Sequence, residues 1–103
     1  MNTKELKMSC NEVMDYIKKN VKVYDILELS YNRVFTPGEV LNIDTSKYNG
    51  KEGLKVVIHI TEGTLTSTVE VDFEEIKDEL IEVIHTPKNK NEMISITIDK
   101  CDI

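Results

Sequence analysis

The hairpin segment, residues 54–73, reads LKVVIHITEGTLTSTVEVDF and carries the clearest structural signal in the chain. Along both halves, side chains that favour a buried face alternate with polar ones. The inward set is Leu54, Val56, Ile58, Ile60, Leu65, Ser67, Val69, Val71 and Phe73. A period of two is typical of half-buried strands, and β-branched residues fit a pleated sheet. Because Gly63 interrupts the pattern near its middle, we predict an antiparallel β-hairpin as the centre of the fold.

A helix is predicted before the hairpin. Residues 9–12, Ser-Cys-Asn-Glu, have the S-x-x-E form of a capping box, in which a serine hydroxyl and a glutamate side chain bind amide groups at a helix start. The apolar residues that follow at helical spacing are Val13, Met14, Ile17 and Val21. The helix is expected to end near Asn20. An imperfect alternation predicts a strand over residues 23–29, with Asp25 on its apolar side, and residues 36–39, Thr-Pro-Gly-Glu, are interpreted as a turn.

A second helix is predicted after the hairpin, over residues 74–85. Asp72 can cap its first turn. Its apolar face would consist of Ile76, Leu80, Val83 and Ile84. Pro87 would end this helix, because proline cannot continue a helical backbone. A last strand is predicted from the alternation of Ile94, Ile96 and Ile98 with polar residues.

These elements follow the order α-β-(β)-β-β-α-β, which predicts an α+β fold. We expect a mainly antiparallel sheet of four to five strands, with an N-terminal helix and a second helix before the last strand. A chain of 103 residues has the common size of one domain. Residues 1–103 are therefore expected to form a single small globular domain.

Acidic side chains are concentrated in residues 70–82, a segment that contains seven acids and a single basic residue, Lys77. The seven are Glu70, Asp72, Glu74, Glu75, Asp78, Glu79 and Glu82. Their balance of −6 equals the formal charge of the whole chain. On the predicted helix, the acids from Glu74 onward share one face as like-charge i,i+4 pairs, which destabilise a helix. Three interpretations follow: a face that keeps the protein in solution, a docking surface for a basic partner, or a divalent-cation site.

In its charge pattern, the acidic segment resembles the small acidic inhibitors by which mobile elements block nucleic-acid-binding enzymes. The resemblance implies a small acidic macromolecule-binding protein, a phage or plasmid inhibitor or regulator that engages a protein partner with a basic surface through the seven acids. Twelve lysines, one arginine and no alanine indicate an AT-rich genome, expected to be that of a bacterium or its mobile elements. One alternative is a structural or assembly subunit that contacts partners, or a second copy, through a sheet edge. Another is a small enzyme that uses carboxylate acid–base chemistry.

Several classes of function lack their usual residues. A single arginine, Arg33, and a pI near 4.9 argue against direct nucleic-acid binding. The acids lack the spacing of a calcium loop, and neither histidine has a second ligand at zinc spacing. We therefore assign no metal, no cofactor and no catalytic residue, and expect a protein that is not an enzyme. No apolar run is long enough to cross a bilayer, so we expect a cytoplasmic location without membrane contact.

The cysteines and histidines are expected to be structural. Cys10 and Cys101 lie near opposite ends of the chain and are expected to be free thiols in a reducing compartment. His59 is placed in the hairpin. His85 is placed at the end of the acidic helix, where an imidazole suits the helix dipole.

Overall fold

The computed structural model describes residues 2–47, 53–62 and 65–99. A mainly antiparallel sheet and two short helices confirm the predicted α+β class. The elements in chain order are β1 (Asn2–Met8), α1 (Cys10–Asn20), β2 (Ile26–Tyr31), β3 (Val34–Asp44), β4 (Lys55–Glu62), β5 (Leu65–Asp72), α2 (Phe73–Ile76), the 3-10 helix η1 (Lys77–Glu79), β6 (Leu80–Thr86) and β7 (Glu92–Ile98). The sheet has seven strands where four to five were predicted, and the first element is a strand rather than a helix. No helix in these ranges is long and apolar enough to span a membrane.

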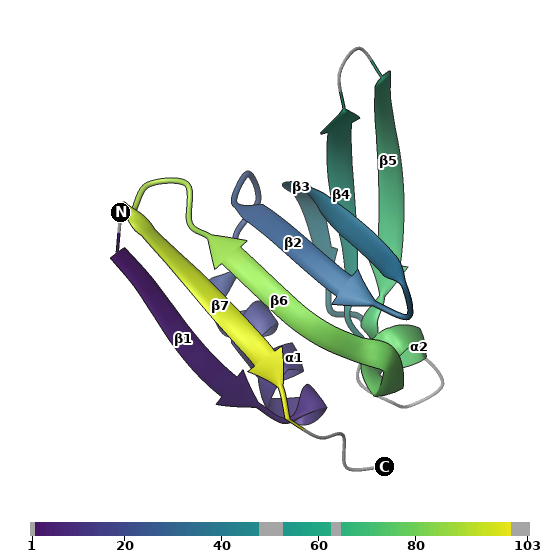
Figure 1. The fold of residues 1–103 in the computed structure, drawn as a ribbon. Helices are drawn as coiled ribbons and strands as arrows, with labels where there is room; N and C mark the ends of the chain where they lie inside the picture. The colour runs from purple at the N-terminus through teal and green to yellow at the C-terminus, as the bar shows by residue number, and fades with distance from the viewer. Residues whose placement is uncertain (1, 48–52, 63–64, 100–103) are drawn as a thin grey trace.

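The strands are ordered β1-β7-β6-β2-β3-β4-β5 across the sheet. Neighbours are antiparallel except β1 and β7, which run parallel. In Figure 1, α1 lies behind β7 and β6, whereas the β4–β5 hairpin stands at an angle to these strands at the other end of the sheet. The short α2 lies at the base of that hairpin.

The predicted hairpin is confirmed as β4 and β5. Val56 lies opposite Val71, and Ile58 lies opposite Val69, so the apolar sets of both strands share one face. Val56 and Ile58 are fully buried. The predicted turn at Gly63 lies outside the described residues.

The N-terminal helix α1 is confirmed together with its capping box. The Ser9 hydroxyl accepts a hydrogen bond from the Glu12 amide at 3.2 Å, and the Glu12 carboxylate accepts one from the Ser9 amide at 3.0 Å. The helix and the sheet share one core, formed by Val13, Met14, Ile17, Val21, Leu27, Leu29, Val40, Leu54, Val56, Ile58, Val71, Phe73, Leu80, Val83, Ile94 and Ile96. Cys10 is buried and disulfide-bonded, which corrects the expected free thiol, and Cys101 lies outside the described residues.

The helix predicted over residues 74–85 is wrong. The helical turns end at Glu79, and Leu80–Thr86 forms β6, which pairs with β2 on one side and β7 on the other. Like-charge acid pairs oppose a longer helix. Four of the seven residues of β6 are β-branched, which favours a strand once neighbours exist on both sides. The predicted cap is confirmed, because the Asp72 carboxylate accepts a hydrogen bond from the Glu74 amide at 3.0 Å, in a helical turn that begins at Phe73.

The first strand, β1, has no counterpart in the sequence-based prediction. Its sequence is largely polar, and it is an edge strand whose one partner is β7. In this parallel pair, Asn2 lies opposite Glu92 and Met8 lies opposite Ile98. A strand defined mainly by a partner from the far end of the chain carries little local signal.

The turn predicted at residues 36–39 is also wrong, because β3 runs straight through it. Pro37 lies opposite Glu28 of β2 in an extended backbone. Gly38 permits a close approach to β4, since a Cβ atom at this position would collide with the backbone carbonyl of His59. Pro-Gly here therefore serves strand packing rather than chain reversal.

Candidate functional site

A buried histidine lies at the centre of the candidate site. The alternation along β6 directs Val83 and His85 toward the core, and the His85 side chain is flanked by the neighbouring positions Leu27 of β2 and Ile94 of β7. His85 is only 1% exposed. A buried polar side chain needs hydrogen-bond partners, because leaving it unpaired in an apolar core is costly. The predicted place of His85 at the end of a helix is therefore corrected: it is a core position of a strand.

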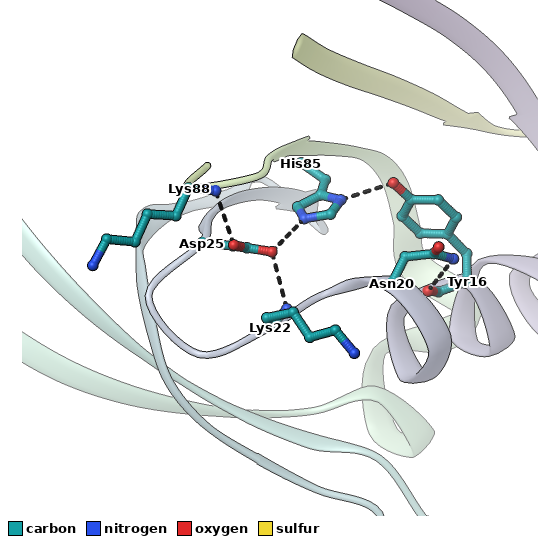
Figure 2. Close-up of polar contacts among 6 residues, drawn as sticks. All are labelled: Tyr16, Asn20, Lys22, Asp25, His85 and Lys88. Atoms are coloured by element: carbon teal, nitrogen blue, oxygen red, sulfur yellow. Dashed lines mark hydrogen bonds and ion pairs between the residues drawn. The ribbon is translucent and has the colours of Figure 1, made fainter. Parts of the chain in front are cut away.

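Two side chains from distant parts of the sequence bind the two ring nitrogens of His85. The Tyr16 hydroxyl lies 2.7 Å from His85 Nδ1, and the Asp25 Oδ2 atom lies 2.8 Å from His85 Nε2. Figure 2 shows the three side chains with these contacts as dashed lines. The Tyr16 and His85 rings meet edge to face, with centroids 5.7 Å apart. We call this arrangement the Tyr16–His85–Asp25 chain. It connects α1, the connection from α1 to β2, and β6.

The Asp25 carboxylate is held by two backbone amides as well as by the histidine. It accepts hydrogen bonds from the amides of Lys22 and Lys88, each at 2.9 Å, and its residue is 4% exposed. Burial alone would raise the pKa of Asp25. The hydrogen bonds from His85, Lys88 and Lys22 outweigh burial and lower the pKa below its ordinary 3.8. The carboxylate is therefore ionised at neutral pH and acts as a hydrogen-bond acceptor.

A strained backbone places Asp25 in this position. Tyr24, the residue before it, has a φ of 78°, in the left-handed region that favours glycine. Hydrogen bonds fix the segment on both sides, from the Tyr24 amide to the Val40 carbonyl at 2.7 Å and from the Val40 amide to the Asp25 carbonyl at 2.9 Å. Strain of this kind costs on the order of 1–3 kcal/mol and occurs often at ligand-binding segments.

Of the three residues in the Tyr16–His85–Asp25 chain, Tyr16 is the most exposed. It is half-buried on α1, where the Asn20 amide group donates a hydrogen bond to its backbone carbonyl at 3.0 Å. Burial, followed by the negative charges of Glu92 and Asp25, raises the pKa of Tyr16 to about 12. The phenol is therefore neutral at physiological pH.

A cavity of about 620 Å³ opens beside the Tyr16–His85–Asp25 chain. Four lysines line it: Lys4 of β1, Lys22 before Asp25, and Lys88 and Lys90 between β6 and β7. The remaining lining residues are Leu6, Tyr16, Asn20, Val23, Tyr24, Asp25, His85, Pro87, Asn89, Glu92 and Ile94. Four lysines against the carboxylates of Asp25 and Glu92 give the lining a formal balance of +2, in a chain whose net charge is −6.

Two of the lysines contact neighbouring side chains at the cavity. The Lys4 Nζ atom lies 3.4 Å from a Glu92 carboxylate oxygen. The Lys88 Nζ atom lies 5.0 Å from the centre of the Tyr24 ring, in cation–π geometry. The cavity thus combines cations, an aromatic ring and the apolar side chain of Ile94, a mixture suited to a small molecule rather than to a metal ion. Among the described residues, no group of histidine, cysteine and acidic side chains could hold a metal.

The seven predicted partner-binding acids do not share one helix face. They are distributed over β5, α2, η1 and β6, in chain order Glu70, Asp72, Glu74, Glu75, Asp78, Glu79 and Glu82. Glu74 forms an ion pair with Lys77 at 3.2 Å. Glu75, Asp78 and Glu79 are exposed. We call residues 74–79 the acidic turn; its role in binding stays a prediction.

Sequence reasoning missed the Tyr16–His85–Asp25 chain, although two signals were present. Asp25 was placed on the apolar side of a predicted strand, where an acid requires a partner. His85 alternates with Ile84 and Thr86 in a β-branched segment, but the segment was interpreted as a helix. Once that segment is a strand, His85 falls on its buried side.

The fold and the cavity together define a class of protein: an α+β domain with one main helix, a seven-stranded sheet and a hydrogen-bonded Tyr–His–Asp chain beside a cavity. The polypeptide belongs to the family described as an uncharacterized protein conserved in archaea, DUF2097, whose model matches residues 4–96. Every cavity-lining residue named above falls within that range. No curated protein and no solved structure shows significant similarity to the chain. The family description contains nothing about a phage, an inhibitor, a partner or a reaction.

Proposed function

We propose that this protein binds a small anionic molecule in the cavity beside the Tyr16–His85–Asp25 chain. The observation that carries the proposal is the positive balance of the cavity lining in an otherwise acidic chain. Lysines that converge on a concave site attract anions, and low-dielectric walls strengthen their field. A cavity of about 620 Å³ also lies within the range of small-molecule sites, roughly 300–1,000 Å³.

The buried polar chain supports a functional interpretation. Replacing buried charges and their partners with apolar side chains of similar size is often neutral or stabilising, so stability alone is a weak reason to keep the Asp25 carboxylate and its His85 partner in the core. Titratable groups that border a cavity are, by contrast, candidates for ligand recognition. The strained backbone at Tyr24 also supports a role in ligand recognition, because it places the Asp25 carboxylate at the cavity.

We propose binding rather than catalysis, as expected from the sequence. A tyrosine nucleophile is activated by a neighbouring base, a role that His85 Nδ1 could fill, and by a lowered pKa. The pKa of Tyr16 is instead raised to about 12, which keeps its hydroxyl protonated and weakly nucleophilic. The expected cytoplasmic location likewise stays a prediction.

Titration with inorganic phosphate at low ionic strength, followed by amide chemical shifts, tests the proposal. Shifts are expected to concentrate on residues that line the cavity. Lys4→Gln is expected to weaken binding, and Lys7→Gln is its matched control, because the two lysines lie on the same strand, three residues apart, and project from opposite faces. Equal effects of the two substitutions, or shifts spread over the whole surface, would contradict the proposal.

A second candidate function is the binding of a basic protein partner by the acidic turn, as a regulator or inhibitor. Four of its six residues are acidic, and its one lysine is already paired with Glu74. Reversing the charge of Glu75 and Glu79 to lysine is expected to abolish capture of such a partner at low salt while folding is retained. Glu5→Lys, an exposed position on β1, serves as the control. Unchanged capture by the doubly reversed variant would exclude this function.

A further inference from the structure

Two conditions set the direction of the hydrogen bonds in the Tyr16–His85–Asp25 chain: the acceptor at one end and a neutral His85 ring. An ionised carboxylate can only accept, so the hydrogen between Asp25 Oδ2 and His85 Nε2, 2.8 Å apart, belongs to the ring. In a neutral imidazole with hydrogen on Nε2, the other nitrogen is bare and accepts. The Tyr16 hydroxyl, 2.7 Å from His85 Nδ1, therefore donates to the ring.

This direction decides what Tyr16 offers to the cavity. A hydroxyl group has one hydrogen, and that of Tyr16 is committed to His85. Its oxygen keeps its acceptor capacity, and Tyr16 lines the cavity. At this end of the cavity, the tyrosine oxygen is consequently a hydrogen-bond acceptor and not a donor.

The neighbours of Tyr16 reinforce this polarity. Glu92 carries an acceptor carboxylate close enough to act on the Tyr16 hydroxyl electrostatically. The amide group of Asn20 donates to the Tyr16 backbone carbonyl, which leaves the Asn20 side-chain oxygen as a further acceptor at the lining. The four cavity lysines, all of them exposed residues, supply positively charged hydrogen-bond donors. The cavity lining thus presents hydrogen-bond acceptors from Tyr16, Asn20 and Glu92 together with positive charge from the lysines.

We propose that the ligand is an anion that also carries a hydroxyl or amino group, which donates a hydrogen bond to the Tyr16 oxygen while the anionic group contacts the lysines. This inference rests on the proposed anion-binding function and adds the chemical class and the orientation of the ligand. An anionic oxygen placed directly on Tyr16 would face another acceptor, so a purely anionic ligand cannot use this end of the cavity. A ligand that lacks the donor leaves the tyrosine oxygen desolvated and without a partner, which is the source of the discrimination.

Two probes of equal charge and similar length test this assignment by calorimetric titration: glycerol 1-phosphate, which carries two hydroxyl groups, and propyl phosphate, which carries none. Wild-type protein is expected to bind the glycerol ester about tenfold more tightly, since one well-placed hydrogen bond has about that effect. Tyr16→Phe is expected to bring the ratio close to one. Lys4→Gln is expected to weaken both probes equally and to keep the ratio.

The outcomes distinguish the proposed anion binding from the proposed role of Tyr16. If neither probe binds, the proposed function fails and this inference fails with it. If both bind with equal affinity to wild-type protein, or if the preference survives in Tyr16→Phe, anion binding stands and the role of Tyr16 is overturned.

A measurement on unmodified protein keeps the inference testable even if Tyr16→Phe does not fold. Long-range ¹H–¹⁵N correlation spectra of the imidazole rings are expected to show His85 with hydrogen on Nε2 and a bare Nδ1 at neutral pH. His59→Gln assigns the signals, because the chain contains two histidines. A His85 ring with hydrogen on Nδ1, whether neutral or as imidazolium, would overturn the acceptor role of Tyr16 without affecting the proposal that lysines bind an anion.

Discussion

Replacing Asp25 with alanine removes the acceptor at one end of the Tyr16–His85–Asp25 chain. Three donors lose their partner: the amides of Lys22 and Lys88, each at 2.9 Å, and the His85 ring at 2.8 Å. The two lysines are exposed residues, so water can reach their amides, whereas His85 is 1% exposed. An unpaired buried donor costs about 1–3 kcal/mol, and losing a hydrogen bond to a charged acceptor has a similar effect, so we expect Asp25→Ala to lower the free energy of unfolding by about 3 kcal/mol.

Urea unfolding followed by circular dichroism measures this loss, as a shift in midpoint at constant m-value. The matched control is Asp15→Ala, an exposed acid on α1, for which a change within about 0.5 kcal/mol is expected. If Asp25→Ala lowered the free energy of unfolding no more than the control, the expected loss of three hydrogen-bond partners would be refuted. Water or a ring flip would then have compensated for all three donors.

Wild-type protein and Asp25→Ala together also test the pH dependence of stability. Because the folded-state pKa of Asp25 is lowered from 3.8, its contribution to stability is present above about pH 4 and is lost as the pH falls through the folded-state value. The stability of wild-type protein is therefore expected to fall more steeply below pH 4 than that of Asp25→Ala. Parallel acid-unfolding curves would contradict the lowered pKa.

Three further predictions concern separate elements. Gly38→Ala is expected to destabilise the protein by about 2 kcal/mol in urea unfolding, because its Cβ would collide with the His59 backbone carbonyl; an unchanged midpoint would show that β3 and β4 can move apart. Ser9→Ala removes the helix cap that binds the Glu12 amide and is expected to cost about 1 kcal/mol, measurable as a lower melting temperature. In an ultraviolet titration, Tyr16→Phe should remove the tyrosine that ionises near pH 12 rather than at the ordinary 10.0, and wild-type stability is expected to fall as the pH rises from about 10 through 12.

The parts of the fold that were predictable are those whose signal is local. The capping box at Ser9 and the alternation in residues 54–73 depend on neighbours within a few positions, and both are confirmed. The apolar spacing of residues 80–86 also fits a helix, so the sequence alone predicts the wrong element there. What decides its conformation is pairing with β2 and β7, and that pairing is not contained in a local window.

The site was less predictable than the fold because it is assembled across long sequence separations. Tyr16 and His85 are 69 residues apart, and Asp25 and His85 are 60 apart. Each residue taken singly has an ordinary structural interpretation. Their mutual contacts depend on β6 being a strand, since a helix over the same residues would not have fixed His85 on the buried side beside Asp25.

Charge density along a sequence and charge balance around a cavity are different quantities, and in this protein they have opposite signs. The acids in residues 70–82 stand out because they are contiguous, whereas the cavity lysines come from β1, from the connection before β2 and from the connection between β6 and β7. Lys4 reaches the cavity because β1 pairs with β7, in a register that sets it opposite Ile94. Without that edge pairing, the hydrogen-bonded Tyr16–His85–Asp25 chain would keep all its own contacts but lose the wall that carries Lys4 and Leu6. The pairing of β1 with β7 is therefore the step that places a cavity wall beside the buried polar cluster.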